Sequence, residues 1–250
     1  MLRRFTGTEA KPDNERPVLF IDDGGVLNDN RLRRPEWIRL IGEFMPSRLA
    51  GSAEEWAAAN RAVVTQAFWT DIQRRLTSFE NHRQFQRSYA LAWMHRMCET
   101  VGVACPADDE AVRLHTELSC YVAERADAAM AGAAEAVLRL KRAGYTLYMA
   151  SGTPSWELRG ILGRMGILEV FSGLYGPDLV DQVKYGPAFY EKIFAHAGVV
   201  PDRALVIESD LECCRWAGEA GAGAVWIDLE GRGDARTLAE LVHSLTEGET

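Results

Sequence analysis

Four short apolar runs, each followed by polar or acidic residues, constrain the fold of this chain most strongly. They are VLFI (18–21), YTLYMAS (145–151), ALVIES (204–209) and GAVWID (223–228). Runs of this kind are typical of strands that are buried on both faces, as in a parallel sheet. Helical spacing recurs between them, for example at Leu158, Ile161, Leu162 and Met165. This alternation predicts an α/β fold, a Rossmann-like parallel sheet with right-handed crossovers.

Residues 30–128 interrupt the alternation. They contain no strand pattern but several amphipathic helical patterns, one of them at Trp37, Leu40, Ile41 and Phe44. The segment is too long for a loop. We therefore expect an inserted all-helical cap at 30–128, an α/β core formed by 17–29 and 129–250, and a flexible tail at 1–16.

Composition and charge narrow the choice of partner. The chain has 250 residues, 47% of them hydrophobic, and a formal net charge of −8 without a long basic run. This excludes a nucleic-acid footprint of the usual basic kind and favours a small molecule as the partner, and the anion-binding residues described next make a small anionic substrate the expectation. We find no run of about eighteen apolar residues and no apolar signal segment, which predicts a cytoplasmic protein without membrane contact. No feature of the sequence fixes the oligomeric state.

Polar residues with chemical potential follow three of the predicted strands. The carboxyl ends of parallel strands share one edge of the sheet, where such folds bind ligands. Asp22 follows the first strand, and a carboxylate there can attack phosphorus or carbon and form a covalent intermediate. Ser151, Gly152 and Thr153 precede a predicted helix that starts at Pro154, with Thr153 as its cap. Free N–H groups and hydroxyls at that position suit an anion.

The order of these features resembles the haloacid dehalogenase (HAD) superfamily of hydrolases. The resemblance is carried by FIDDGGVL (20–27), YMASGTP (148–154), VKYGPAFYEKIF (183–194) and VIESDLECCRWAGEAGA (206–222). It implies that Asp22 is the nucleophile, that Ser151 is catalytic and that Gly152 and Thr153 bind substrate. It also implies that Lys184 balances the charge of Asp22 and of the reacting oxygens.

The same resemblance implies a Mg²⁺ cofactor. Its ligands would be Asp22, the main-chain carbonyl of Gly24, Glu208 and Asp210, all of which offer the hard oxygen atoms that Mg²⁺ prefers. A structural alternative is that Glu208 and Asp210 only cap the helix that follows them.

The sequence departs from the superfamily pattern at two motifs. Phosphatases of the superfamily carry a second Asp in the first motif as general acid and base, and Gly24 stands at that position. Asp23 cannot easily replace it, because successive side chains on a strand point to opposite faces. In the fourth motif the metal-binding Asp falls on Ser209, and the acids are displaced to either side of it. Loss of the acid would slow a phosphatase by about a hundredfold to ten-thousandfold.

Three functions stay open. We expect first a phosphatase for a small phosphorylated metabolite, because this is the superfamily's commonest activity. The alternative is a metal-independent 2-haloacid dehalogenase, whose relatives also lack the second Asp and carry a Tyr at the position of Tyr190. Halide leaves without a proton, although the charge of Glu208 would oppose an anionic substrate. The third is a non-catalytic ligand-binding protein. A phosphonate-cleaving relative needs a lysine in the insert, and residues 30–128 contain none.

Overall fold

The computed structural model describes residues 16–246 and divides the chain into two compact units. One comprises the chain up to Asn30 and from Ala128 onward, and the other comprises Arg31–Asp127. Apart from Arg16, the tail predicted at 1–16 lies outside the described residues. None of the helices between residues 16 and 246 combines the length and apolar character that a membrane crossing requires.

The first unit is built on a parallel sheet of five strands in the order β3-β2-β1-β4-β5. The strands are β1 (Val18–Ile21), β2 (Leu147–Ala150), β3 (Gly173–Tyr175), β4 (Ala204–Glu208) and β5 (Gly223–Trp226). β1 lies in the centre, with Phe20 paired to Tyr148 of β2 and to Val206 of β4. The predicted α/β class with a Rossmann-like parallel sheet is therefore confirmed.

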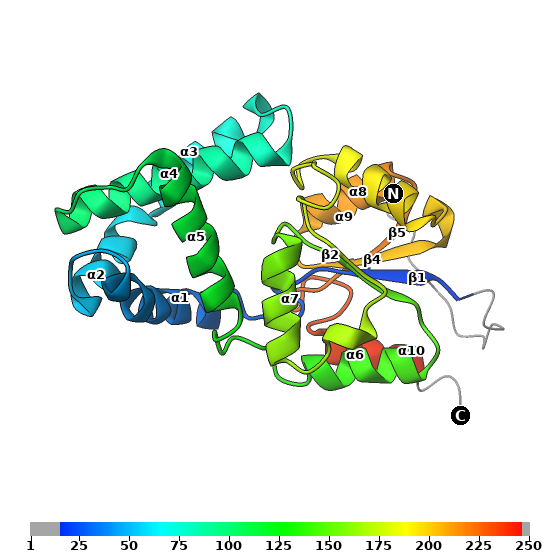
Figure 1. The fold of residues 1–250 in the computed structure, drawn as a ribbon. Coiled ribbons are helices and arrows are strands. Elements are labelled where there is room, and N and C mark those ends of the chain that lie inside the picture. Colours follow the sequence, from blue (N-terminus) through cyan, green and yellow to red (C-terminus); the bar gives the residue numbers. More distant parts are fainter. Residues whose placement is uncertain (1–15, 247–250) are drawn as a thin grey trace. The chain divides into compact units, whose positions relative to one another are not determined.

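Helices cover both faces of this sheet (Figure 1). One face carries α6 (Ala133–Arg142), α7 (Ser155–Arg164) and α10 (Leu238–Thr246), and the other carries α8 (Pro187–Ala197) and α9 (Leu211–Glu219). Successive β1 side chains enter the two layers in turn. Leu19 and Ile21 pack with α6 and α7, whereas Phe20 packs with α8. Burial on both faces explains why the strand sequences are continuously apolar.

The second unit is all-helical. Its helices are α2 (Ala53–Val63), α3 (Gln66–Arg75), α4 (His82–Val101) and α5 (Asp108–Ala123), together with α1 (Asn30–Phe44), which begins at the last residue of the first unit. Single 3-10 turns complete the two units at Met45–Ser47, Leu76–Ser78, Leu168–Val170 and Pro201–Arg203. Trp56, Met94 and Leu118 form part of the helical unit's own apolar core.

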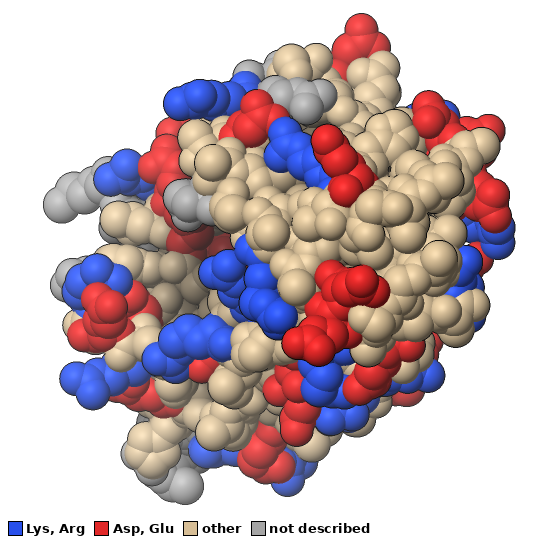
Figure 2. All heavy atoms as spheres, turned by 90° about the vertical axis from the view of Figure 1, so that its left-hand side faces the viewer, with Lys and Arg blue, Asp and Glu red and all other residues tan. Residues whose placement is uncertain are grey.

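Local signals fix the helix ends in this unit. Ser52 and Glu55 form a reciprocal capping box at the start of α2, and Gly102 ends α4 in the left-handed conformation. The surface charges are mixed. Arg39, for instance, lies between Glu36 and Glu43 on α1. Figure 2 shows both basic and acidic side chains on the face in view.

A buried histidine gives the helical unit a predicted sensitivity to acid. His115 packs edge-on against Tyr89 and Trp93, and its Nδ1 atom is buried without a hydrogen-bond partner among the described residues. Burial lowers the pKa of His115 from 6.5 to about 4. Between these values the unfolded chain takes up a proton that the folded chain refuses, so stability falls as the pH drops from about 6.5 to about 4. The full loss is about 3 kcal/mol.

The measurement is the denaturant midpoint of the protein at pH 7 and at pH 4.5. We expect His115→Phe, which keeps an aromatic ring between Tyr89 and Trp93, to reduce the difference between the two midpoints. The exposed His95 provides the control, because His95→Gln should leave the difference as it is in the wild type. Equal acid sensitivity in His115→Phe and the wild-type protein would contradict this role for burial.

Candidate active site

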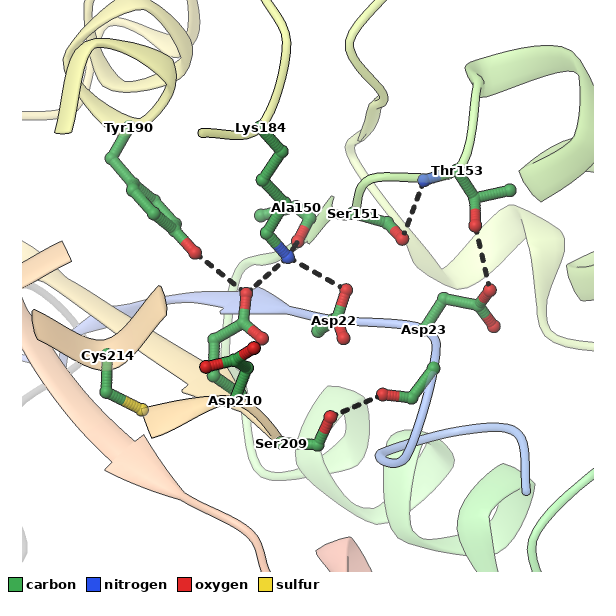
Figure 3. A network of polar contacts seen from close by, with 12 residues as sticks. Asp22, Asp23, Ala150, Ser151, Thr153, Lys184, Tyr190, Ser209, Asp210 and Cys214 are labelled. Atoms are coloured by element: carbon green, nitrogen blue, oxygen red, sulfur yellow. Dashed lines mark hydrogen bonds and ion pairs between the residues drawn. The ribbon is translucent and has the colours of Figure 1, made fainter. Parts of the chain in front are cut away.

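The predicted chemical groups of the α/β unit meet at the carboxyl edge of the sheet (Figure 3). Asp22 follows β1, Ser151 follows β2 and Ser209 follows β4, and these strands are neighbours in the sheet. Lys184 comes from the loop between β3 and α8 and points toward Asp22. Parallel strand order thus brings together residues that are far apart in the sequence.

Lys184 joins two carboxyl groups. Its Nζ atom lies 3.0 Å from Asp22 Oδ1 and donates at 3.0 Å to the carbonyl oxygen of Ala150. The same Nζ atom forms an ion pair with Glu208 Oε1, which also accepts a hydrogen bond of 2.8 Å from the Tyr190 hydroxyl. The Asp22 and Lys184 side chains are only 10% and 8% exposed, so solvent screens this network weakly.

The network shifts the pKa values of its members. Burial raises the pKa of Glu208 to about 8, and the neighbouring Asp22 charge adds to this rise while Lys184 opposes it. Burial also opposes the charged form of Lys184, yet the two carboxyl groups together raise the pKa of its ammonium. The pKa of Tyr190 is raised by burial and by the nearby Glu208. At neutral pH the site therefore holds the Lys184 ammonium and a largely protonated Glu208.

Asp23 has a structural role in the turn that follows β1. Its carboxylate is fully buried and accepts hydrogen bonds from Asn28 Nδ2 at 2.5 Å and from Thr153 Oγ1 at 3.2 Å. Figure 3 shows it turned toward Thr153, whereas Asp22 faces Lys184. The two aspartates that follow the first strand thus serve different purposes, one at the reactive edge and one in holding two turns together.

Gly24 provides no carboxylate at the position where phosphatases of the superfamily carry the second Asp of the first motif. A Cβ atom added there would lie 3.2 Å from Asn30 Oδ1, so the Asn30 side chain stands against the space that a larger residue would need. Gly25, the next residue, has φ +81° and approaches Ser209 so closely that a Cβ atom would lie 2.6 Å from its Oγ. Only glycine fits this turn at position 25 without strain.

The predicted Mg²⁺ ligands do not form a ligand set. The Gly24 carbonyl oxygen accepts a hydrogen bond of 2.6 Å from Ser209 Oγ. Glu208 is engaged by Lys184 and Tyr190. No group of three or more His, Cys, Asp or Glu side chains within residues 16–246 is placed to hold a metal. This donor arrangement does not fit Mg²⁺.

Asp210, the fourth predicted ligand, caps a helix instead. It is exposed, and its Oδ1 accepts a hydrogen bond of 2.7 Å from the backbone N–H of Glu212 in the first turn of α9. The helix-cap alternative therefore describes Asp210, but it does not describe Glu208, which lies inside the network. The reason is the strand end: β4 ends at Glu208, and the chain turns into α9 from Ser209 onward.

The turn after β2 differs from its predicted form. Ser151 Oγ accepts a hydrogen bond of 3.1 Å from the Thr153 N–H, so Ser151 closes a tight turn around the exposed Gly152. Thr153 does not cap α7, because its hydroxyl is engaged by Asp23. Asp178 takes that place and accepts from the Ser155 N–H at 2.6 Å and from the Ser155 hydroxyl at 2.5 Å. The start of α7 thus already binds a side-chain carboxyl group of the protein itself.

Sequence reasoning missed two residues that shape the site. Asp178 ties the loop before Lys184 to α7, and its signal in the sequence is weak, because GPD at 176–178 reads only as a turn. Cys213 lies on α9 close enough to Lys184 and Glu208 for their charges to act on it, and burial raises the pKa of its thiol to about 12. A protonated thiol adds no charge to the network.

The sequence and the structure were compared with those of known proteins. A family model for hydrolases, described as haloacid dehalogenase-like hydrolase, matches residues 18–220. No curated protein matches the sequence at a significant level. The defluorinating L-2-haloacid dehalogenase Rha0230 is a similar solved structure, with 14% identity, a TM-score of 0.64 and coverage of 92% of this chain and 95% of that chain.

Two further solved structures represent different chemistry on the same fold. A predicted phosphoglycolate phosphatase from Haemophilus somnus 129pt is 14% identical, with a TM-score of 0.60 and coverage of 92% and 98% of the two chains. An L-2-haloacid dehalogenase from Xanthobacter autotrophicus with covalently bound chloropropionic acid is also 14% identical, with a TM-score of 0.53 and coverage of 85% and 77%. At these identities the likeness is one of fold.

Proposed function

Since this chain belongs to the haloacid dehalogenase-like hydrolases, we propose that it is a metal-independent dehalogenase that hydrolyses 2-halocarboxylic acids through an ester on Asp22. We prefer this reaction to phosphate ester hydrolysis, which we expected first from the sequence alone. It rests chiefly on one observation, the direct hydrogen bond between Ser209 Oγ and the Gly24 carbonyl. In that contact the Ser209 hydroxyl bonds the Gly24 carbonyl oxygen, one of the ligands that a Mg²⁺ site of the phosphatase pattern would use.

Leaving-group chemistry supports the same choice. Gly24 supplies no general acid, and Asp23 is engaged by Asn28 and Thr153. An alkoxide leaving group needs a proton from such an acid, whereas a halide ion leaves without one. In the first step an Asp22 oxygen attacks C2, the carbon–halogen bond breaks, and its electron pair departs with the halide. Water then cleaves the resulting ester and restores Asp22.

The net charge of the site is more compatible with an anionic substrate than the sequence alone indicated. If Glu208 were ionised, two carboxylates would face one ammonium and repel a substrate carboxylate. Because the pKa of Glu208 is raised to about 8, its neutral form dominates at pH 7 and the charges of Asp22 and Lys184 balance. We assign Lys184 to orient Asp22 and to neutralise its charge, and the turn formed by Ser151, Gly152 and Thr153 to contact the substrate. The dehalogenases among the solved structures offer a precedent for this chemistry on the fold.

The test is a panel of 2-chloro, 2-bromo and 2-fluoro acids and of phosphate monoesters, each assayed with Mg²⁺ and with EDTA. We expect halide release from at least one haloacid at rates that are the same with Mg²⁺ and with EDTA. Phosphate release that EDTA stops would overturn the proposal in favour of the phosphatase. Silence toward all substrates would favour a non-catalytic ligand-binding protein.

A further inference from the structure

Hydrolysis of an Asp22 ester needs a group that accepts a proton from the attacking water. The usual candidates near Asp22 are committed elsewhere. Asp23 is fully buried and accepts from Asn28 and Thr153, and the exposed Asp210 caps α9. The Cys213 thiol, with its pKa raised to about 12, is a poor acceptor. None of these three residues is therefore suited to act as the base in the second step, the hydrolysis of the ester.

Resting on the proposed dehalogenation, we propose that Glu208 is the general base that activates water against the Asp22 ester. Glu208 and Asp22 share one partner, because Oε1 of Glu208 and Oδ1 of Asp22 both contact Lys184 Nζ. Two oxygens that contact one nitrogen lie within about two hydrogen-bond lengths, roughly 6 Å. One water molecule held between the two carboxyl groups would span that separation.

Formation of the ester changes the charge around Glu208. In the resting site one ammonium is shared between two carboxyl groups, and burial leaves little solvent to screen them. In the intermediate Asp22 is an uncharged ester, so Lys184 pairs with Glu208 alone. This pairing favours the ionised form of Glu208, which accepts protons. The Tyr190 hydroxyl, 2.8 Å from Oε1, holds the Glu208 carboxyl group in place.

The proton balance closes over this step. The water oxygen bonds to the Asp22 Cγ atom, and one water proton passes to Glu208. The tetrahedral intermediate then collapses, its bond to the substrate oxygen breaks, and the remaining hydroxyl proton goes to that oxygen. The products are the 2-hydroxy acid, the Asp22 carboxylate and a protonated Glu208, which is its resting form, so the proton released to solvent is the one that Glu208 loses when the ester forms. The two steps together consume one water and release one halide and one proton.

The experiment separates the two halves of the reaction in Glu208→Gln. With the haloacid that the wild-type protein turns over best, we expect about one halide per active site, followed by a steady rate about 10²–10⁴-fold below that of the wild type. Intact-mass measurement should show the protein carrying the substrate without its halogen, and peptide analysis should place it on Asp22. Glu208→Asp should restore part of the steady rate. Glu212→Gln, an exposed acid on α9, is the matched control and should turn over as the wild type does.

Several outcomes would overturn the assignment. One is that Glu208→Gln turns over at the wild-type steady rate. Another is that Glu208→Gln is folded, as checked by circular dichroism, but releases no halide at all. The latter would mean that Glu208 acts before the ester forms, through Lys184. If the wild-type protein itself releases no halide, the proposed function and this role of Glu208 are both overturned. This outcome can be told from the others because neither the wild-type protein nor any variant then releases the first equivalent of halide.

Discussion

Asp22→Asn should remove turnover entirely, with a loss of at least about 10⁴-fold in kcat, while the protein stays folded. The amide cannot form the covalent ester on which the reaction depends. The fold should persist because Lys184 keeps its ion pair with Glu208 and its bond to the Ala150 carbonyl. The measurement is steady-state halide release together with the thermal midpoint of the variant.

The exposed His95 of the helical unit serves as control, and His95→Ala should keep the wild-type rate. Turnover by Asp22→Asn that exceeds trace contamination would refute the mechanism. On the proposed mechanism no neighbouring acid can replace Asp22, because the Asp23 carboxylate points to Thr153.

Lys184→Met should lower the free energy of unfolding by about 3–5 kcal/mol at pH 8 and remove activity. Loss of the ammonium leaves two carboxyl groups buried without a counter-charge, and breaking a buried pair in this way has a cost of that size. The measurement is denaturant unfolding at pH 5 and at pH 8. The exposed Lys192 on α8 supplies the control, because Lys192→Met removes a solvated charge and should change stability little.

The pH dependence of Lys184→Met has a definite sign. Without the ammonium, which lowers the pKa of Glu208, the folded-state pKa of Glu208 rises further above its unfolded value, so the folded protein binds protons more tightly than the unfolded chain. Stability of the variant is then best at low pH and is lost as the pH rises from about 4 toward and beyond 8. A deficit that is the same at pH 5 and pH 8, or that is larger at pH 5, would show that the ion pair does not cause it. Adding Glu208→Gln should recover part of the deficit at pH 8.

Most of the α/β sheet could be predicted from sequence because its strands are buried on both faces. Such strands read as continuous apolar runs, and β1, β2, β4 and β5 all lie within the predicted ones. β3 was missed for a physical reason. It has only three residues, begins with Gly173 and pairs with β2 alone at the edge of the sheet, so it needs no long apolar run.

The sequence predicted the position of those candidate site residues that lie at the ends of strands. Asp22, Ser151 and the acids near 209 follow strands, and parallel order brings them to one edge. What the residues bond to was not predictable, because this depends on contacts between distant segments. Glu208 contacts Lys184, Asp178 takes the start of α7, and Ser209 contacts the Gly24 carbonyl. None of these pairings has a sequence spacing that could identify it.

The two ends of the helical insertion leave the α/β unit side by side. Asp29 N–H donates to the Ala128 carbonyl at 2.8 Å, and Met130 N–H donates to the Leu27 carbonyl at 2.8 Å. The core thus closes on itself before the insertion begins, and the entropy of closing a loop grows slowly, by roughly 0.6 kcal/mol for each doubling of its length. The bonds that close this junction join residues of the α/β unit alone, so the register that aligns Asp22 with Lys184 does not depend on residues 31–127 for its closure.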